Sequence, residues 1–344
     1  GTTGRPKGVM LTHRGQVAAA QILCIESSVE ATDVIALAMP LYHIGAKITW
    51  LSHSWRACTF VLHRSFRPRD MLESIAAYKA TTTLLAPTML KDVLDLLDGE
   101  KFDASSLRKV FYSAAPMPTP LLRRGLAKFG PVFAQFYGAT ESGAPATTLH
   151  RHHHLPDGTP AQVRRLASAG QPMSGCEIRT VRPDDTDCVI EEPGEILIRS
   201  GALMKGYWNN PAATAEAFSD GWLRSGDIGL FDDEGFVFIV DRKKDMIVSG
   251  GENIYSREVE EALLAHAGVA EAAVVGKPDE RWGETVVAFI VAKPGAALTP
   301  EALTEHCRTA IAAFKRPRDL RFVEALPKLP NGKVEKTKLR QMLK

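Results

Sequence analysis

The sequence predicts an α/β protein: a mostly parallel, doubly wound sheet with a small β-barrel subdomain, followed by a smaller α+β C-terminal domain. From Asp33 to Tyr137, short β-type runs alternate with helical stretches, which is typical of parallel strands joined by crossover helices. Several β-type runs then follow one another with little helix between them. The last part has its own apolar helices and strands over about a hundred residues, enough for a separate domain.

Residues 1–150 hold the elements of the predicted parallel sheet. The strands are expected at 34–38, 58–62, 82–85, 110–113 and 132–136, and the helices at 43–54, 68–79, 88–97 and 120–129. Ligands of such sheets bind beyond the carboxyl ends of the strands. Polar, glycine-rich stretches follow the strands of this sequence in that way.

Residues 1–240 are predicted to form one large domain, of which residues 171–240 form the small barrel, and residues 241–344 form the C-terminal domain. The barrel strands are expected at 177–181, 195–199 and 235–240. A charged run at 241–245 suits an exposed connection. Beyond it we expect helices at 256–265, 300–314 and 335–343 and strands at 272–276 and 285–292.

Composition excludes several classes of protein. Forty-two Lys and Arg residues against 40 Asp and Glu residues give a net charge of +2, too balanced for a nucleic-acid binder. The five cysteines are odd in number and widely spaced, which argues against a disulfide framework or a zinc site. This cysteine pattern favours a location in the reducing cytoplasm. No apolar run approaches the roughly 18 residues of a membrane span. The chain opens inside a motif without an initiator Met, so we expect an N-terminal part to precede it.

The first eight residues, GTTGRPKG, are predicted to hold phosphate groups. Gly4 lets the backbone turn its N–H groups toward an anion, the hydroxyls of Thr2 and Thr3 donate hydrogen bonds, and Lys7 adds positive charge. The alternative is an ordinary flexible Gly/Pro loop. The motif is not a Walker A sequence, because Lys7 is followed by glycine rather than Ser or Thr.

A second motif, QFYGATESG at residues 135–143, follows a predicted strand. Tyr137 can stack on a purine, Thr140 can bond a phosphate, and Glu141 is a hard oxygen ligand suited to Mg²⁺. The alternative is a capped turn in which Glu141 is only solvated.

Upstream of that motif, the small residues at 113–117, Ala115 and Pro116 among them, would let a flat base or an acyl group approach the backbone.

Three further features lie toward the C-terminus. Asp227 stands in what reads as a Gly-flanked turn, where it could accept two ribose hydroxyls or bond its own backbone. Gly250 and Gly251 predict a sharp hairpin turn. Lys333 stands on a Pro/Gly turn before a predicted helix, where a lone surface lysine is usually a solvated charge. Three consecutive histidines at 152–154 are left without a role, because neighbouring loop residues cannot all face one metal ion.

Seven segments, taken in order, resemble the adenylate-forming family of acyl-CoA synthetases, luciferases and peptide-synthetase adenylation domains. They are GTTGRPKG, MPLYHIGA, QFYGATESG, GEILIRSGALMKGYW, GWLRSGDIG, DRKKDMIVSGGENIYSREVE and LPNGKVEKTKLR, and they span residues 1 to 340. The chain looks most like a fatty-acyl-CoA or aryl-CoA ligase. Family members normally carry a further N-terminal stretch.

The resemblance implies a role for each candidate residue. The catalytic residues would be Lys333, Thr140 and His43, with Glu141 as the metal ligand and Lys244 as the hinge of a mobile C-terminal domain. Cofactor binding would fall to Thr2, Thr3, Gly4, Lys7, Ala115, Pro116, Tyr137, Gly138, Asp227, Arg242, Gly250 and Gly251. Lys333 would bridge the substrate carboxylate and the α-phosphate. His43 would line a pantetheine tunnel, although a histidine at a helix start is more often a cap.

The function implied is ATP-dependent adenylation of a fatty or aryl carboxylic acid, release of pyrophosphate, and transfer of the acyl group to CoA. ATP, Mg²⁺ and coenzyme A are the expected cofactors. A carrier-protein or amine acceptor remains an alternative, as does a nucleotide-binding fragment without activity. No nucleic-acid partner is expected, and a homodimer is left open.

Overall fold

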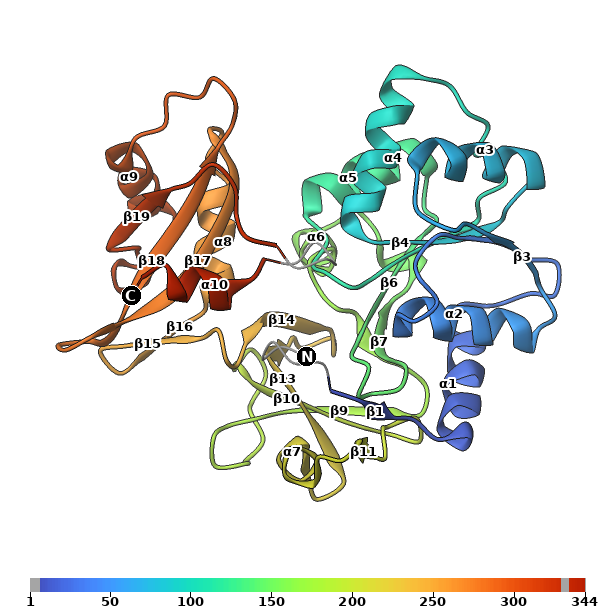
Figure 1. The fold of residues 1–344 in the computed structure, drawn as a ribbon, viewed down its shortest axis with the longest axis horizontal. Coiled ribbons are helices and arrows are strands. Elements are labelled where there is room, and N and C mark those ends of the chain that lie inside the picture. Colours follow the sequence, from blue (N-terminus) through green and yellow to red (C-terminus); the bar gives the residue numbers. More distant parts are fainter. Residues whose placement is uncertain (1–6, 329–333, 344) are drawn as a thin grey trace. The chain divides into compact units, whose positions relative to one another are not determined.

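The computed structural model describes residues 7–328 and 334–343. The predicted site residues Thr2, Thr3, Gly4 and Lys333 lie outside that part of the chain. The chain forms two compact units. The large unit comprises residues 1–225 and 229–239, and the small unit comprises residues 226–228 and 240–344. Figure 1 labels their elements.

A seven-stranded sheet forms the centre of the large unit, in the order β3-β2-β4-β5-β6-β7-β8. All five predicted strands are confirmed as its parallel part: β2 (Val34–Leu37), β3 (Thr59–Leu62), β4 (Thr82–Leu85), β5 (Lys109–Tyr112) and β6 (Phe133–Gly138). The sequence did not predict the antiparallel strands β7 (Pro145–Leu149) and β8 (Gln171–Pro172). β7 begins with proline and β8 has two residues, so neither gives a periodic signal.

Helices cover both faces of this sheet, as the doubly wound prediction requires (Figure 1). One apolar cluster joins one sheet face to α3 (Pro68–Tyr78), α4 (Pro87–Gly99) and α5 (Thr119–Phe129). A second cluster joins the other face to α1 (His13–Glu26) and α2 (Ile44–Trp55). Local signals set where these helices begin: Pro68 and Pro87 occupy first-turn positions, and the Thr12 hydroxyl accepts the Gly15 N–H at 3.0 Å.

The second sheet, most of which belongs to the large unit, runs β12-β13-β10-β9, with β14 also paired to β13. Its strands are β9 (Cys176–Val181), β10 (Gly194–Ser200), β12 (Phe218–Ser219), β13 (Trp222–Phe231) and β14 (Val237–Arg242). The predicted strands 177–181, 195–199 and 235–240 correspond to β9, β10 and β14. A short antiparallel pair, β1 (Val9–Met10) with β11 (Gly206–Tyr207), forms a two-stranded sheet of its own. The remaining short helices are η1 (Arg151–His153), α6 (Pro160–Arg165) and α7 (Pro211–Ala217).

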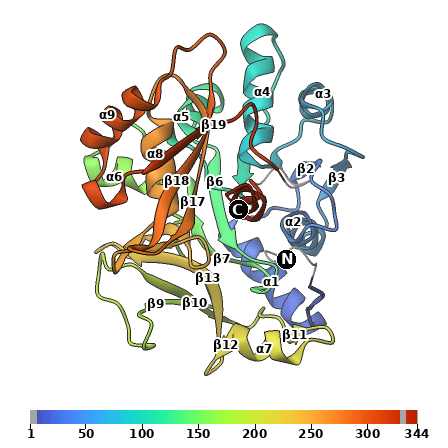
Figure 2. The same ribbon diagram turned by 60° about the vertical axis from the view of Figure 1, so that its left-hand side comes forward.

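The small unit contains a sheet in the order β16-β15-β18-β17, with β19 paired to β18. Figure 2 labels β17, β18 and β19 of this sheet. Its strands are β15 (Ile247–Ser249), β16 (Glu252–Ile254), β17 (Val269–Asp279), β18 (Gly283–Ala292) and β19 (Asp319–Phe322). Apolar side chains of α8 (Ser256–Leu264) and α9 (Pro300–Ala310) pack on one face, and Leu339 of α10 (Lys336–Gln341) packs on the other.

One helix boundary in the small unit was predicted wrongly. The helix expected to reach residue 314 ends at Ala310, because Ile311 is extended (φ −139°, ψ 157°). A separate 3₁₀ turn, η2 (Ala313–Lys315), follows.

Over the described residues, no helix has the length and apolar character needed to cross a membrane.

A buried ion pair at the amino ends of β2 and β5 gives a stability prediction. The Lys109 ammonium lies 2.6 Å from the Asp33 carboxylate, and the two side chains are 4% and 0% exposed. Lys109→Met should lower the free energy of unfolding by about 3–5 kcal/mol, because it leaves a buried carboxylate without its main partner. The control Lys79→Met breaks an exposed pair with Asp103 and should cost about 1 kcal/mol or less. Urea unfolding measures both, and equal losses would contradict the prediction.

Candidate functional site

Two loops with predicted contacts leave the same edge of the central sheet. β5 and β6 are parallel neighbours, with Tyr112 opposite Gln135, so the loops that follow them start side by side. Ala115 and Pro116 are exposed in the first loop, and Thr140 is exposed in the second. This edge therefore presents small apolar groups and a hydroxyl to solvent.

Tyr137 and Gly138 end β6 at this edge. Tyr137 is half-buried and pairs with Thr147 of β7. A Cβ atom on Gly138 would lie 2.8 Å from the Ala144 carbonyl oxygen, so a side chain here would push the loop away from the strand. Glycine thus keeps the tyrosine and the following loop close together.

The loop that carries Glu141 is held in one shape by its own hydrogen bonds. The Ser142 hydroxyl oxygen accepts the Ala139 N–H at 2.9 Å and lies 2.6 Å from the Ala144 carbonyl oxygen. Gly143 has φ +70°, a left-handed conformation that favours glycine. These bonds cap the turn, in which Ser142 is buried, and the role of Glu141 as a metal ligand stays a prediction.

Tyr207 connects this loop to the end of the phosphate motif. Its hydroxyl donates to the Glu141 carboxylate at 2.7 Å, and the Lys7 ammonium lies 4.3 Å from the centre of its ring. Tyr207 is 7% exposed. Burial, with the Glu141 carboxylate as a second cause, raises the pKa of Tyr207 above its ordinary value, so the phenol stays a hydrogen-bond donor at neutral pH. A cation and a carboxylate from two distant motifs thus share one aromatic residue.

The donor set at Glu141 fits Mg²⁺ that arrives with a nucleotide. Protein sites for this ion commonly supply one or two carboxylates and leave the other positions to water and substrate phosphates. Tyr207 occupies one acceptor direction of Glu141, and a carboxylate has about four such directions. Within the described residues no three His, Cys, Asp or Glu side chains form a metal-holding group, so a complete protein cage is not what these residues offer.

Asp227 does not lie in a turn, and that prediction was wrong. It belongs to the ten-residue strand β13, in which Gly226 takes φ +72°. Gly226 therefore marks a local irregularity of the strand rather than its end. The predicted neighbour is confirmed: the Arg242 guanidinium lies 3.3 Å from the Asp227 carboxylate, and both residues belong to the small unit.

The charged run 241–245 is less exposed than predicted. Asp241 and Asp245 are 6% and 7% exposed, because each carboxylate has a specific partner. Asp241 accepts hydrogen bonds from the backbone and hydroxyl of Ser256 at the start of α8. Asp245 pairs with Arg340 of α10 at 2.8 Å. The Arg340 side chain also donates to the Lys244 carbonyl at 3.4 Å. The charged run that contains the predicted hinge residue Lys244 is therefore connected to both α8 and α10.

Gly250 and Gly251 form the predicted hairpin turn between β15 and β16, with φ +62° and +86°. The Gly250 N–H donates to the Trp282 carbonyl at 2.8 Å, and a Cβ atom on Gly250 would lie 2.9 Å from the indole ring. Arg318 and Arg281 lie over the same ring, at 4.3 and 4.9 Å from its centre. The turn thus adjoins an aromatic surface with two cations.

His43 lies at the amino end of α2 and acts as its cap, which is the alternative considered for it. Its Nδ1 accepts the Gly45 N–H at 3.2 Å. The loop that contains it follows β2, so it leaves the same edge of the sheet as the loops after β5 and β6. A role in a pantetheine tunnel stays a prediction.

The histidine cluster divides into structural and exposed members. His154 is 2% exposed, lies 3.0 Å from the Tyr112 hydroxyl and has Nδ1 2.9 Å from the His150 carbonyl oxygen. Burial lowers the pKa of His154 to about 4. His152 is exposed. These contacts give His154 a packing role within the large unit.

A pH prediction follows for His154. Between pH 6.5 and 4 the His154 imidazole is protonated in the unfolded chain but neutral in the folded protein. The free energy of unfolding should therefore fall as the pH drops through this window. The loss should approach about 3 kcal/mol at pH 4. Urea unfolding at pH 7, 5.5 and 4.5 should show a smaller loss for His154→Gln than for the wild type, and no such change for His152→Gln. Equal pH slopes for all three proteins would contradict the assignment.

Comparison with known proteins assigns the family. Residues 1–208 match the model of the AMP-binding enzymes, and residues 258–333 match the model of the AMP-binding enzyme C-terminal domain. The chain belongs to the AMP-binding enzyme family. The resemblance found in the seven sequence segments is therefore confirmed.

Named relatives of this AMP-binding enzyme include two curated ligases and one solved structure. The fatty acid–[acyl-carrier-protein] ligase ScoC of Streptomyces coeruleorubidus is 38% identical over 99% of this chain and 65% of its own length. The 2-succinylbenzoate–CoA ligase of Bacillus velezensis is 37% identical over 100% of this chain and 68% of its own. The o-succinylbenzoate CoA synthetase of Bacillus subtilis, in complex with an acyl-adenylate intermediate, gives a TM-score of 0.88 at 34% identity over 99% of this chain and 67% of its own. The chain thus spans about two thirds of the length of these relatives.

Sequence reasoning missed two residues of this AMP-binding enzyme that the structure places beside predicted ones. Tyr207 lies within a segment that was quoted for the resemblance, but no chemical role was given to it. Trp282 lies outside every quoted segment. A signal existed for Tyr207, since an aromatic residue with a polar tip needs a hydrogen-bond partner when it is buried. None pointed to Trp282.

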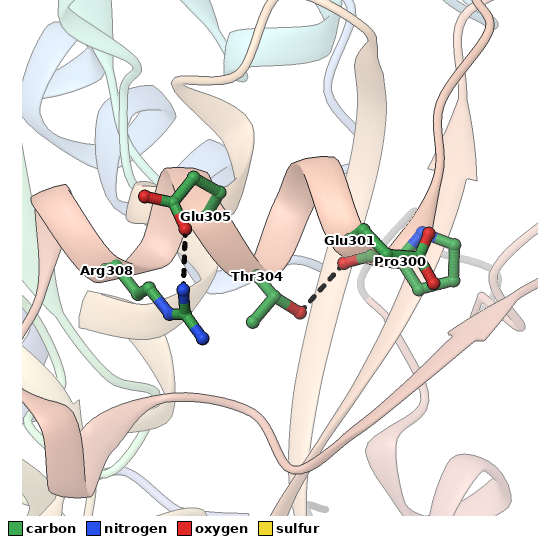
Figure 3. A pocket seen from close by; sticks show the side chains of 5 residues that line it. All are labelled: Pro300, Glu301, Thr304, Glu305 and Arg308. Atoms are coloured by element: carbon green, nitrogen blue, oxygen red, sulfur yellow. Dashed lines mark hydrogen bonds and ion pairs between the residues drawn. The ribbon is translucent and has the colours of Figure 1, made fainter.

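A hollow on the surface of α9 is not part of the predicted site. It is lined by Pro300, Glu301, Thr304, Glu305 and Arg308 (Figure 3). Arg308 pairs with Glu305, and Thr304 bonds the Pro300 carbonyl. All five residues come from one helix, and none is a predicted nucleotide contact of the AMP-binding enzyme.

Proposed function

We propose that the protein is an AMP-forming acyl-CoA ligase that adenylates a fatty or aryl carboxylic acid with ATP, releases pyrophosphate, and transfers the acyl group to CoA. The observation that carries the proposal is the cluster of Lys7, Tyr207 and Glu141. It joins the two motifs expected to hold the phosphates and the metal ion. Family membership supports it, since the relatives named above are ligases that act on carboxylic acids.

In the first step, a carboxylate oxygen of the substrate attacks the α-phosphorus of ATP, and the bond to pyrophosphate breaks. Negative charge builds on the phosphate oxygens, so the cations Lys7 and Lys333 stabilise the transition state. Glu141 would hold Mg²⁺, which supplies further charge neutralisation at the phosphates when it is bound. Asp227 and Arg242 would hold the ribose, and Tyr137 would stack on the adenine.

In the second step, the thiol of the acceptor attacks the acyl carbon, and the carbon–oxygen bond to AMP breaks. The small unit would turn about Lys244 between the two steps and bring the Gly250–Gly251 turn to the acyl group. The bonds that Arg340 makes to Asp245 and to the Lys244 carbonyl give this hinge a defined resting geometry.

The surface next to the Gly250–Gly251 turn favours CoA as the acceptor. CoA carries phosphate groups and a nucleotide base, and guanidinium groups on an aromatic ring suit phosphates. Arg281, Trp282 and Arg318 provide that combination. The name of the 2-succinylbenzoate–CoA ligase also gives CoA as the acceptor. The name of the ScoC relative gives an acyl-carrier protein, which is therefore the second candidate acceptor.

The acceptor can be tested by substitution at this surface. Arg318→Ala in the full-length protein should raise the KM for CoA about 10-fold, as expected for loss of a charge-assisted hydrogen bond worth about 1.5–3 kcal/mol. The KM for ATP should not change. The control Arg308→Ala removes another exposed arginine, from α9, and should leave both constants unchanged. Acyl-adenylate that forms but passes to a carrier protein and never to CoA would refute CoA as the acceptor.

The acid itself is proposed only as a class. Fatty and aryl acids are both consistent with the small residues Ala114, Ala115 and Ala144 near the predicted base and acyl region. Pyrophosphate release measured across a panel of both kinds of acid tests the class. Release with amino acids alone would contradict it.

A further inference from the structure

We infer that Tyr207 is a positioning residue that holds Glu141 and Lys7 in place for Mg²⁺ and the ATP phosphates. The inference rests on the proposed function and adds a residue to it. Tyr207 is expected to act through its two neighbours rather than by touching the reacting atoms. Two independent sets of contacts support this role, one from the backbone and one from the side chain.

The backbone around Tyr207 is tied to both motifs. The Lys205 N–H donates to the Met10 carbonyl at 2.8 Å, and the Trp208 N–H donates to the Gly8 carbonyl at 2.7 Å. These bonds form the β1–β11 pair directly after Lys7, in which Val9 lies opposite Tyr207.

On the other side, the Met204 N–H donates to the Glu141 carbonyl at 2.9 Å. Gly143 fits closely against the same segment, because a Cβ atom there would lie 1.9 Å from the Ala202 carbonyl oxygen. Residues 202–208 are therefore bonded both to residues 8–10, directly after Lys7, and to the loop that carries Glu141.

The Tyr207 ring itself is held firmly. Its backbone N–H donates to the Thr214 hydroxyl at 2.9 Å, and its ring packs in the apolar cluster that includes Ile196, Ile198 and Val237. A fixed ring offers two different surfaces. Its hydroxyl end meets the Glu141 carboxylate at 2.7 Å, and its face lies under the Lys7 ammonium at 4.3 Å.

Each contact orients a charged group without neutralising it. A neutral phenol donates to Glu141 and leaves the carboxylate its negative charge for a metal ion. A cation–π contact leaves Lys7 its positive charge for a phosphate. A direct ion pair between Glu141 and Lys7 would instead have neutralised both charges. The arrangement suits a site that must receive a metal ion and a polyanion together.

The test separates the hydroxyl from the ring. Tyr207→Phe keeps the ring and its packing but removes the bond to Glu141. Calorimetry of ATP binding at increasing Mg²⁺ should show that the variant needs about 10-fold more Mg²⁺ for half-maximal binding, while ATP binding in EDTA stays unchanged. Tyr207→Leu also removes the contact with Lys7 and should weaken ATP binding in EDTA several-fold. Tyr78→Phe, at an exposed tyrosine of α3, is the control and should change neither quantity.

A double-mutant cycle keeps the test decisive if one variant is less stable. Tyr207→Phe should have little further effect on Mg²⁺-dependent binding when Glu141 is already glutamine, because Tyr207 is proposed to act on Mg²⁺ through the Glu141 carboxylate, which that variant lacks. Additive effects, or a wild-type requirement for Mg²⁺ in Tyr207→Phe, would overturn the inference.

The binding assay needs no catalysis, so its result is independent of the proposed reaction. Wild-type protein that binds MgATP but shows no carboxylate-dependent exchange would instead contradict the proposed function.

Discussion

Replacing Glu141 with glutamine is expected to lower carboxylate-dependent ATP–pyrophosphate exchange by about 100- to 1,000-fold, the loss typical when one group that stabilises transition-state charge is removed. The amide keeps the size of the side chain and can remain near the Tyr207 hydroxyl, but it has no charge for Mg²⁺. The effect should therefore fall on activity and not on folding. The exchange assay at saturating ATP and acid measures it directly.

A matched control distinguishes this effect from a general loss of carboxylate charge. Glu73→Gln, at an exposed position of α3, should exchange at the wild-type rate. Thermal unfolding of Glu141→Gln should stay within about 1 kcal/mol of the wild type, as for most substitutions outside packed cores. Exchange within a few-fold of the wild type in Glu141→Gln would remove Glu141 from the metal site.

Replacing Lys333 with alanine should separate the two half-reactions. Adenylation should fall by about 100- to 1,000-fold, because the ammonium that bridges the carboxylate and the α-phosphate is lost at the transition state. Thioester formation from supplied acyl-adenylate and CoA should stay within a few-fold of the wild type, since the proposed hinge motion withdraws this lysine before that step. Exchange measures the first half-reaction, and thioester release measures the second.

Lys338→Ala supplies the control for Lys333, since Lys338 is an exposed lysine of the neighbouring helix α10. It should leave both half-reactions unchanged. If Lys333→Ala slows both half-reactions equally, the lysine does not act in adenylation alone. The proposed turn of the small unit about Lys244 between the two steps then loses its main support.

Much of the fold could be predicted because its signals are local. Each parallel strand is an apolar run between helices with regular periodicity, and proline or threonine marks where several of those helices begin. The strands that were missed have no such signal. β7 reads PATTL and is buried along most of its length without alternation, because both of its faces are covered. β8 has only two residues, fewer than a periodic pattern needs.

The candidate site residues could be predicted because they lie in short motifs whose chemistry is evident from the sequence. Their contacts could not be predicted, because the partners lie far away in the sequence. Tyr207 is 66 residues from Glu141 in sequence and meets it only through the β1–β11 pair and the contacts of residues 202–208. The environment of Asp227 was misjudged because glycine marks strand irregularities as well as turns. The burial of Asp241 and Asp245 could not be predicted, because their partners Ser256 and Arg340 belong to helices later in the chain.

The chemistry of activation can be tested by following one oxygen atom. Full-length protein is given ATP, CoA and a carboxylic acid labelled with ¹⁸O in its carboxylate, and the AMP product is analysed by mass spectrometry. Attack of the carboxylate on the α-phosphorus followed by cleavage of the carbon–oxygen bond leaves one labelled oxygen in AMP. Each turnover is therefore expected to give AMP that carries one ¹⁸O atom. Unlabelled AMP, or ADP together with labelled inorganic phosphate, would show that no acyl-adenylate forms.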